Sequence, residues 1–366
     1  EDRRMLAMFG NAWPDARNLS VSFPTDGVQV GSYANDINQT LDQIATRQQW
    51  QELSLRAFQT WSIHADINVG LRNDFDNNFG APGLTVGDPR FGEFRIGAFP
   101  QTGVLANSVP FQVVAGTYSG DLLLNSNEQF TFHDWNDNLG PDPATLEPGE
   151  RDLFSLFLHE IGNTLGIDDN MMDWTVMFRQ YTVPKGVLSA EDIASIRAIY
   201  GERSDPYEQI DNGQLQVATL VPTPVGFDTA NDVIRSRGSL VTGSDVDFYR
   251  IVPLAGQDSV TIRVNASGLS LLKSRLDIVD AAGQIVDQTS ASSVFENDNS
   301  LTITGLQNHS ELYIKVSAID SSDVYSVGDY GLEIDYRDTS VQAADPKPGR
   351  YDSGPDAVFS NFDLID

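Results

Sequence analysis

A change of hydrophobic pattern at Gly201 constrains the fold more than any other feature of the sequence. Before Gly201, stretches with helical spacing alternate with short runs of β-branched and aromatic residues; after it, β-type runs recur between turn residues. A chain of 366 residues is long enough to build two hydrophobic cores. We therefore expect an α+β domain over residues 13–202, a linker over 203–212, an all-β sandwich or jelly roll over 213–337, and a loose acidic tail over 338–366.

Three helices are expected in the first domain. The first covers residues 36–62, where apolar residues recur near helical spacing. The second begins after Gly149 and carries a run of apolar residues. The third begins at Ser189, a helix N-cap with Asp192 three residues later, and ends at Gly201.

Charge and composition exclude several classes of partner and site. Fifty-two acidic residues against 23 basic ones give a formal net charge of −29, which repels nucleic acid and anionic membrane surfaces. No apolar run approaches the ~18 residues that a membrane span requires, so we expect no membrane-spanning helix. The chain has no cysteine, which excludes disulfides, thiolate metal sites and cysteine nucleophiles.

The chemistry of the chain is concentrated in the segment H-E-I-G-N-T-L-G-I-D-D, which begins at His159. Residues four apart on a helix share one face, so His159 and Asn163 would point at the same metal ion. Glu160 would project beside that ion, where a carboxylate can take a proton from water. Gly166 permits a sharp turn, after which Asp169 can supply a third ligand.

This segment resembles H-E-x-x-H-x-x-G-x-x-H/D, the zinc-binding signature of the metzincins. Downstream, Trp174-Thr175-Val176-Met177-Phe178 is similar to the Met-turn of the matrixin branch, in which the thioether of Met177 would lie beneath the metal. Tyr181 follows where matrixins build the wall of the pocket for the substrate residue after the scissile bond. The likeness to matrixins extends over roughly residues 13–202.

The resemblance implies a metzincin-like catalytic domain, with a twisted, mostly parallel sheet plus three helices. It implies a zinc-dependent metalloendopeptidase that hydrolyses peptide bonds through a metal-bound water, with Glu160 as general base. Leu122, Leu123 and Leu124 resemble the edge strand that pairs with an extended peptide, so these residues and Tyr181 are the predicted substrate-binding residues.

Asn163 departs from the family pattern, because it stands where a second histidine ligand is found. A neutral amide oxygen is a weaker ligand for Zn²⁺ than imidazole. The alternative hypothesis is therefore a catalytically impaired pseudoprotease that acts as a peptide-binding or adhesive module. A third hypothesis treats the enzyme fold as a calcium-stabilised scaffold for the sandwich. The residues alone leave these hypotheses open.

Calcium is the second metal that the sequence predicts, because Asp and Asn oxygens crowd several loops. In matrixins, carboxylates at the positions matching Asn125 and Glu128 help to hold calcium, so these two are predicted ligands. Residues 74–78 and 134–138 are similarly rich in Asp and Asn, which also favour turns. In the second domain, Asp245 and Asp247 either bind calcium or simply begin a strand.

The second domain resembles the bacterial pre-peptidase C-terminal domain. The stretches Asp245-Val246-Asp247-Phe248-Tyr249-Arg250 and Tyr330-Gly331-Leu332 carry the likeness. That family is a small β-sandwich appended to secreted bacterial proteases, which implies a bacterial, extracellular protein. The chain opens Glu1-Asp2-Arg3-Arg4, without a signal peptide in this segment, and we interpret this as a processed or truncated terminus. We expect a monomer that acts on a protein or peptide substrate.

Overall fold

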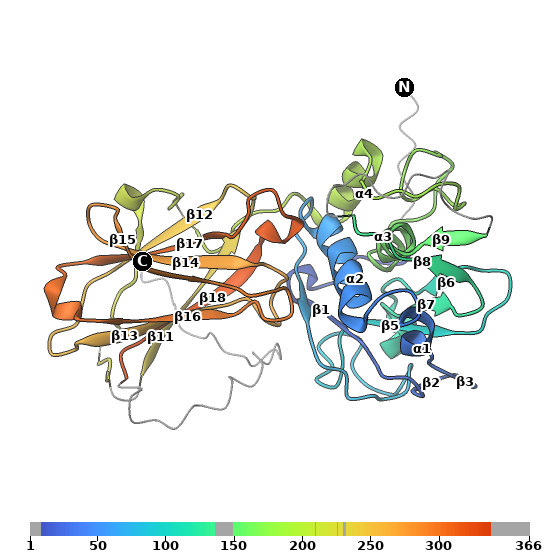
Figure 1. The fold of residues 1–366 in the computed structure, drawn as a ribbon, viewed down its shortest axis with the longest axis horizontal. Helices are drawn as coiled ribbons and strands as arrows, with labels where there is room; N and C mark the ends of the chain where they lie inside the picture. The colour runs from blue at the N-terminus through green and yellow to red at the C-terminus, as the bar shows by residue number, and fades with distance from the viewer. Residues whose placement is uncertain (1–8, 136–148, 209, 225, 230–231, 338–366) are drawn as a thin grey trace. The chain divides into compact units, whose positions relative to one another are not determined.

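The computed structural model describes residues 9–135, 149–208, 210–224, 226–229 and 232–337 (Figure 1). The chain divides between Arg203 and Ser204 into two compact units, each of which is treated separately below. The acidic tail predicted over residues 338–366 lies outside the described residues.

The first unit is built on a five-stranded sheet in the order β4-β1-β5-β7-β6. Its strands are β4 Val69–Leu71, β1 Leu19–Ser22, β5 Phe94–Phe99, β7 Leu122–Asn125 and β6 Ala106–Ser108. The first four run parallel, and β6 pairs antiparallel with β7, so the expected mostly parallel sheet is confirmed. Two small ladders accompany it: β2 Gln29–Val30 with β3 Tyr33–Ala34, and β8 Gln129–Thr131 with β9 Glu150–Asp152.

The described part of the first unit has four α-helices instead of three: α1 Ile37–Leu41, α2 Arg47–Ser62, α3 Leu153–Thr164 and α4 Ala190–Tyr200. The single helix predicted over residues 36–62 is wrong, because Thr46 starts a new helix with a capping box to Gln49. In the break, the Asp42 carboxylate accepts a hydrogen bond from the Trp50 indole at 2.9 Å. The described residues also form two short 3-10 turns, η1 Ala16–Asn18 and η2 Val113–Tyr118.

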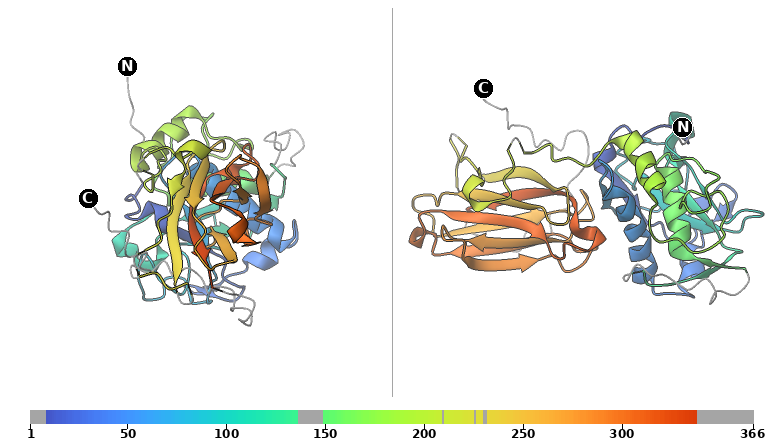
Figure 2. Two further views of the ribbon diagram at one scale, coloured as in Figure 1. Left: turned by 90° about the vertical axis from the view of Figure 1, so that its left-hand side faces the viewer. Right: turned by 90° about the horizontal axis from the view of Figure 1, so that it is seen from above.

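Helices α2 and α3 lie side by side (Figures 1 and 2). The fully buried Trp61 of α2 donates its indole N–H to the carbonyl of Leu158 on α3 at 2.9 Å. This bond satisfies a polar atom inside an otherwise apolar contact, which fixes how α3 is rotated against α2.

A buried ion pair lies beside the sheet of the first unit. Arg95 of β5 donates to both oxygens of Asp74 at 2.8 and 2.9 Å, and each side chain is 1 % exposed. The guanidinium also stacks 4.3 Å from the ring centre of Phe79. Asp74 was one of the acidic residues expected to favour calcium, but here an arginine neutralises it. Nearby Asp121 is fully buried; burial raises its pKa well above the ordinary value, and the positive charge of Arg95 only partly offsets this.

The described part of the second unit forms two sheets, which confirms the expected all-β domain (Figure 1). One sheet has the order β10 Thr219–Leu220, β12 Val246–Ile251, β17 Leu312–Ala318, β14 Ser274–Val279 and β15 Ile285–Ser290. The other has the order β11 Val233–Leu240, β18 Gly328–Asp335, β13 Ser259–Asn265 and β16 Asn299–Thr304. All neighbouring strands in these two sheets are antiparallel except β10 and β12.

Apolar side chains from both sheets of the second unit form one core. Three 3-10 turns, η4 Leu215–Val217, η5 Leu306–Asn308 and η6 Val324–Ser326, connect strands.

The segment predicted as a linker makes hydrogen bonds to the sandwich. The hydroxyl of Tyr207 donates to Asp329 at 3.2 Å, and the side-chain oxygen of Asn212 accepts from the backbone N–H of Phe248 at 3.2 Å. Most of this segment is therefore anchored on the second unit.

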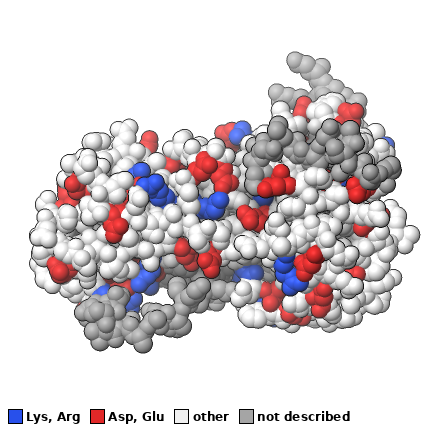
Figure 3. All heavy atoms as spheres, viewed as in Figure 1, with Lys and Arg blue, Asp and Glu red and all other residues white. Residues whose placement is uncertain are grey.

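Charged side chains are interspersed on the face shown in Figure 3, where the described residues form no extended basic patch. In the part of the chain that the structure describes, none of the helices combines the length and the apolar composition of a bilayer span.

Candidate active site

Helix α3 presents the residues of the predicted metal motif. Asp152 caps its N-terminus by accepting the backbone N–H of Ser155 at 2.9 Å. The helix ends before Gly166, whose φ of +93° is a conformation that L side chains rarely adopt. There the N–H of Gly166 donates to the carbonyl of Asn163, and the chain turns back toward Asp169.

The three predicted metal ligands converge. The Nε2 atom of His159 lies 3.2 Å from Oδ1 of Asp169, and Nδ2 of Asn163 lies 3.4 and 3.5 Å from these two atoms. The Nδ1 atom of His159 donates to the carbonyl of Val176 at 2.9 Å, which turns Nε2 toward the other two side chains. The side chains of His159 and Asp169 are 19 % and 43 % exposed, so the cluster is open to solvent on the Asp169 side.

Asn163 contributes an atom that suits a cation. Its Oδ1 is buried without a hydrogen-bond partner. A half-turn of the amide would exchange Oδ1 and Nδ2 and aim the oxygen at the position between His159 and Asp169. One imidazole nitrogen and two oxygens are donors that zinc accepts, although an amide binds it less strongly than a second imidazole. The residues therefore fit a zinc ion in direction and number, with one weak ligand.

His159 and Asp169 shift each other's pKa. Burial alone would lower the pKa of His159, but the hydrogen bond with Asp169 and the charge of Glu160 outweigh it and raise the pKa to about 9. The same hydrogen bond lowers the pKa of Asp169. At neutral pH the two form an ion pair, so a metal ion has to displace the proton on Nε2.

Glu160 lies on the same helix and is 8 % exposed. Burial raises the pKa of its carboxyl, which suits a group that must accept a proton. Ser108 of β6 donates its hydroxyl to Oε2 of Glu160 at 2.7 Å. No spacing signal in the sequence pointed to Ser108, because only the pairing of β6 brings it to α3.

The loop after the motif is tied to the closing helix. The N–H of Asn170 donates to the carbonyl of Met177 at 2.8 Å, which closes the loop. The backbone N–H groups of Val176 and Met177 both donate to the fully buried Asp192 of α4, at 2.9 and 3.3 Å. Met177 is itself fully buried, and its sulfur packs against Gly162 in the middle of α3.

Residues 33–201, which contain this site, match the sequence model of the matrixin family. The first unit is a matrixin domain. The chain is 26 % identical over 154 residues to a probable matrix metalloproteinase, 095L, of Invertebrate iridescent virus 3, covering 42 % of this chain and 35 % of the relative. It is 31 % identical over 102 residues to interstitial collagenase B of Mus musculus, covering 27 % of this chain and 20 % of that protein. The chain thus matches about a third or less of the length of these relatives.

Gly162 is expected to be intolerant of a side chain in this matrixin domain. A Cβ atom there would lie 2.4 Å from the sulfur of Met177 and 2.9 Å from Trp61. We expect Gly162→Ala to lower the free energy of unfolding by about 1–3 kcal/mol, even though alanine favours helices. Urea unfolding followed by tryptophan fluorescence measures this. Combination with Met177→Ala should show a coupling of ~1 kcal/mol; purely additive effects would contradict the contact.

Tyr181 lies at the start of α3. Its hydroxyl accepts the backbone N–H of Asp152 at 2.8 Å, and its ring faces Arg151 at 5.2 Å. His133 also contacts Asp152, at 3.2 Å, so it belongs to this helix start and not to the metal ligands. The role of Tyr181 in a substrate pocket stays a prediction.

The interpretation of Leu122, Leu123 and Leu124 as an edge strand is wrong. Their strand β7 pairs with β5 on one side and with β6 on the other, and all three side chains are at most 6 % exposed. The edge strand on this side of the sheet is β6, and β4 lies at the opposite edge.

The first of the two predicted calcium ligands, Asn125 and Glu128, hydrogen-bonds to nearby backbone groups. The side-chain oxygen of Asn125 accepts the N–H groups of Gln101 and Asn127 at 2.8 and 3.1 Å, and its amide donates to Val104. Glu128 belongs to no group of three imidazoles or carboxylates in the described part of the chain, and the role of both residues in binding calcium stays a prediction. Of the loop 134–138, residues 136–138 lie outside the described residues.

Proposed function

We propose that the matrixin domain is a zinc-dependent metalloendopeptidase. The observation that carries the proposal is the convergence of His159, Asn163 and Asp169 within 3.5 Å, with the buried carboxylate of Glu160 on the same helix. His159, Asp169 and the oxygen of Asn163 would hold the ion. Bound zinc would supply Lewis-acid polarisation of the peptide carbonyl and of the attacking water.

The residues of the chain itself have two tasks in this proposal. The outer edge of β6 has no partner strand among the described residues and would pair with the backbone of an extended peptide. Because Ser108 of β6 contacts Glu160, a peptide bound there would pass the carboxylate. Glu160 would accept a proton from the attacking water and return it to the leaving amine.

A second candidate is a peptide-binding module without catalysis. It is favoured by Asn163, which replaces the expected imidazole. The β6 edge would bind peptides in either case.

We further propose that the protein is secreted and bacterial, as a monomer, with residues 213–337 forming a pre-peptidase C-terminal-like module. The support is the sequence likeness given above, together with the two-sheet architecture of the second unit.

The test is zinc content measured together with turnover. The purified chain is dialysed against buffered zinc, its zinc is determined by elemental analysis, and cleavage of casein or gelatin is measured beside Glu160→Gln. The proposal expects about one zinc per chain and turnover that is lost in Glu160→Gln and in chelator. Peptide binding without zinc and without turnover would establish the second candidate instead.

Ser108 is expected to position Glu160. Ser108→Ala should lower kcat about tenfold with little change in KM, because the carboxylate loses the donor that orients it. Zinc content and the unfolding midpoint should stay unchanged, and Ser108→Thr, which retains the hydroxyl, should recover most of the activity. An equal loss in both variants would contradict a role for the hydroxyl.

A further inference from the structure

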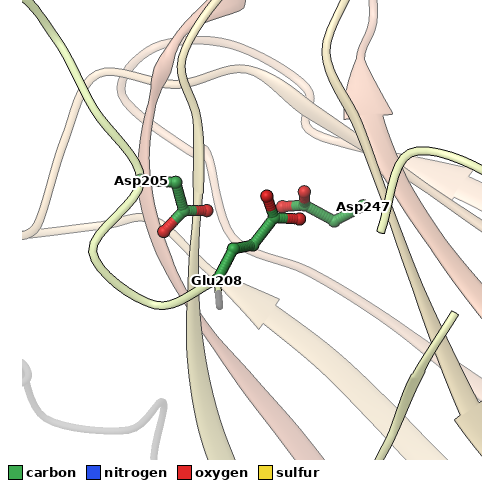
Figure 4. Close-up of side chains that lie close together, drawn as sticks. All are labelled: Asp205, Glu208 and Asp247. Carbon is green, nitrogen blue, oxygen red and sulfur yellow. The ribbon is translucent and has the colours of Figure 1, made fainter. Parts of the chain in front are cut away.

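Three carboxylates meet in the second unit, remote in sequence from the matrixin motif. Asp205 and Glu208 lie on the segment that enters this unit, and Asp247 lies on β12. One oxygen from each lies within 4.8 Å of the others. Figure 4 shows the carboxylate of Glu208 turned toward that of Asp247, with Asp205 on its other side.

Asp247 has an oxygen without a partner. The residue is 1 % exposed, and its Oδ1 is buried with no hydrogen-bond donor. Its Oδ2 accepts from the hydroxyl of Tyr330, which also contacts the hydroxyl of Tyr249 at 2.8 Å. A buried acceptor without a donor is unfavourable, and more so when it is charged. The carboxylate of Asp247 points toward the other two acidic groups (Figure 4). Their negative charges repel it, although its unpartnered oxygen needs an attractive contact.

The electrostatics of Asp247 agree with this geometry. Burial and, to a smaller extent, the negative charges of Asp245, Asp205 and Glu208 together raise the pKa of Asp247 to about 8, against the lowering effect of the Tyr330 hydrogen bond. A cation among the carboxylates would reverse the sign of this field.

Backbone groups hold the other two carboxylates in place. Asp205 accepts the N–H groups of Tyr207 and Ser239 at 2.6 and 3.3 Å, and Glu208 accepts the N–H of Asn212 at 3.1 Å. These donors come from the entering segment and from β11, so the acidic groups are positioned by the fold itself.

We propose that Asp205, Glu208 and Asp247 form a calcium site that fastens the entering segment to β12. The donors are all oxygens, which hard cations prefer, and oxygens up to 4.8 Å apart can both reach one ion at the ~2.3–2.6 Å of calcium–oxygen bonds. Calcium tolerates irregular coordination completed by water, whereas magnesium requires near-octahedral ligands at ~2.0–2.1 Å. The site is independent of the activity proposed for the matrixin domain.

The test uses the full chain, stripped of metal and titrated with calcium chloride in a calorimeter. Sites of this kind in extracellular modules bind calcium with dissociation constants of about 0.1–1 mM. We expect Asp247→Asn to remove one such binding event or weaken it at least tenfold, whereas Asp287→Asn, an exposed position on β15, leaves the titration unchanged.

Hydrogen exchange tests whether calcium binds in the second unit. Calcium should slow exchange of peptides covering residues 204–208 and 245–251 in the unmodified chain and in Asp287→Asn, but not in Asp247→Asn. If Asp247→Asn does not fold, as judged by circular dichroism, the partly exposed Glu208→Gln takes its place. Unchanged calcium binding and protection in the folded variant would overturn the proposal, as would equal protection by magnesium at the same concentration.

Discussion

Replacing Asn163 by histidine is expected to raise the zinc affinity of the matrixin domain by at least ~100-fold. Loss of a residue that merely supports a ligand typically lowers affinity or activity 10- to 100-fold, and Asn163 stands at a ligand position itself. The residue shares a helix face with His159 four positions earlier, and its amide already lies 3.4 Å from Nε2 of His159. An imidazole there would complete a set of two nitrogens and one carboxylate.

The measurement is zinc per chain at a series of buffered free-zinc concentrations, followed by cleavage of a casein-type substrate. Cleavage should increase with zinc occupancy. Asn163→Ala, which removes the amide oxygen, is the matched control and should bind less zinc than the unmodified chain. The double variant Asn163→His, Glu160→Gln should bind zinc without turnover. Zinc affinity that is unaltered by the histidine would show that position 163 is not part of a metal site.

Replacing Arg95 by methionine is expected to lower the free energy of unfolding of the matrixin domain by about 3–5 kcal/mol. Methionine retains apolar packing against Phe79 but removes the charge that neutralises Asp74 at 2.8 Å. Asp74 would keep only hydrogen bonds from neutral groups, such as the Ser22 hydroxyl, and Asp121 would lose the nearby positive charge that lowers its pKa. Native domains are stable by only ~5–15 kcal/mol, so the effect should be large.

Tryptophan fluorescence during urea unfolding measures this loss selectively, because all five tryptophans precede residue 204. The combination Arg95→Met with Asp74→Asn is expected to recover part of the stability, because it removes the carboxylate that would be left buried without a counter-charge. If the double variant is less stable than Arg95→Met, the cost does not come from the uncompensated charge.

The fold was predictable from the sequence where the local pattern and the tertiary structure agree. The capping sequence at Ser189 and the terminating Gly201 define α4 as expected, and the loss of helical spacing after Gly201 corresponds to the two-sheet unit. The break between α1 and α2 was missed because apolar residues keep their spacing across it, while Thr46 and Gln49 form the new cap.

Of the candidate active site, the sequence predicted only the residues of the motif that begins at His159. Spacing along one helix brings His159 and Asn163 together, and the turn at Gly166 brings Asp169 back to them. Contacts that depend on strand order were not predictable: β7 is an inner strand, and Ser108 reaches Glu160 from the true edge. The pairing of Asp74 with Arg95 was missed for the same reason, since a loop rich in acidic residues does not reveal which cation faces it.

The bonds from Val176 and Met177 to Asp192 have a practical consequence for how the protein can be divided. A fragment that ends between Met177 and Asp192 would leave two backbone amides without their acceptor. Truncation mapping should therefore find that the shortest autonomously folding fragment of the matrixin domain ends beyond Tyr200, well after its last proposed metal ligand.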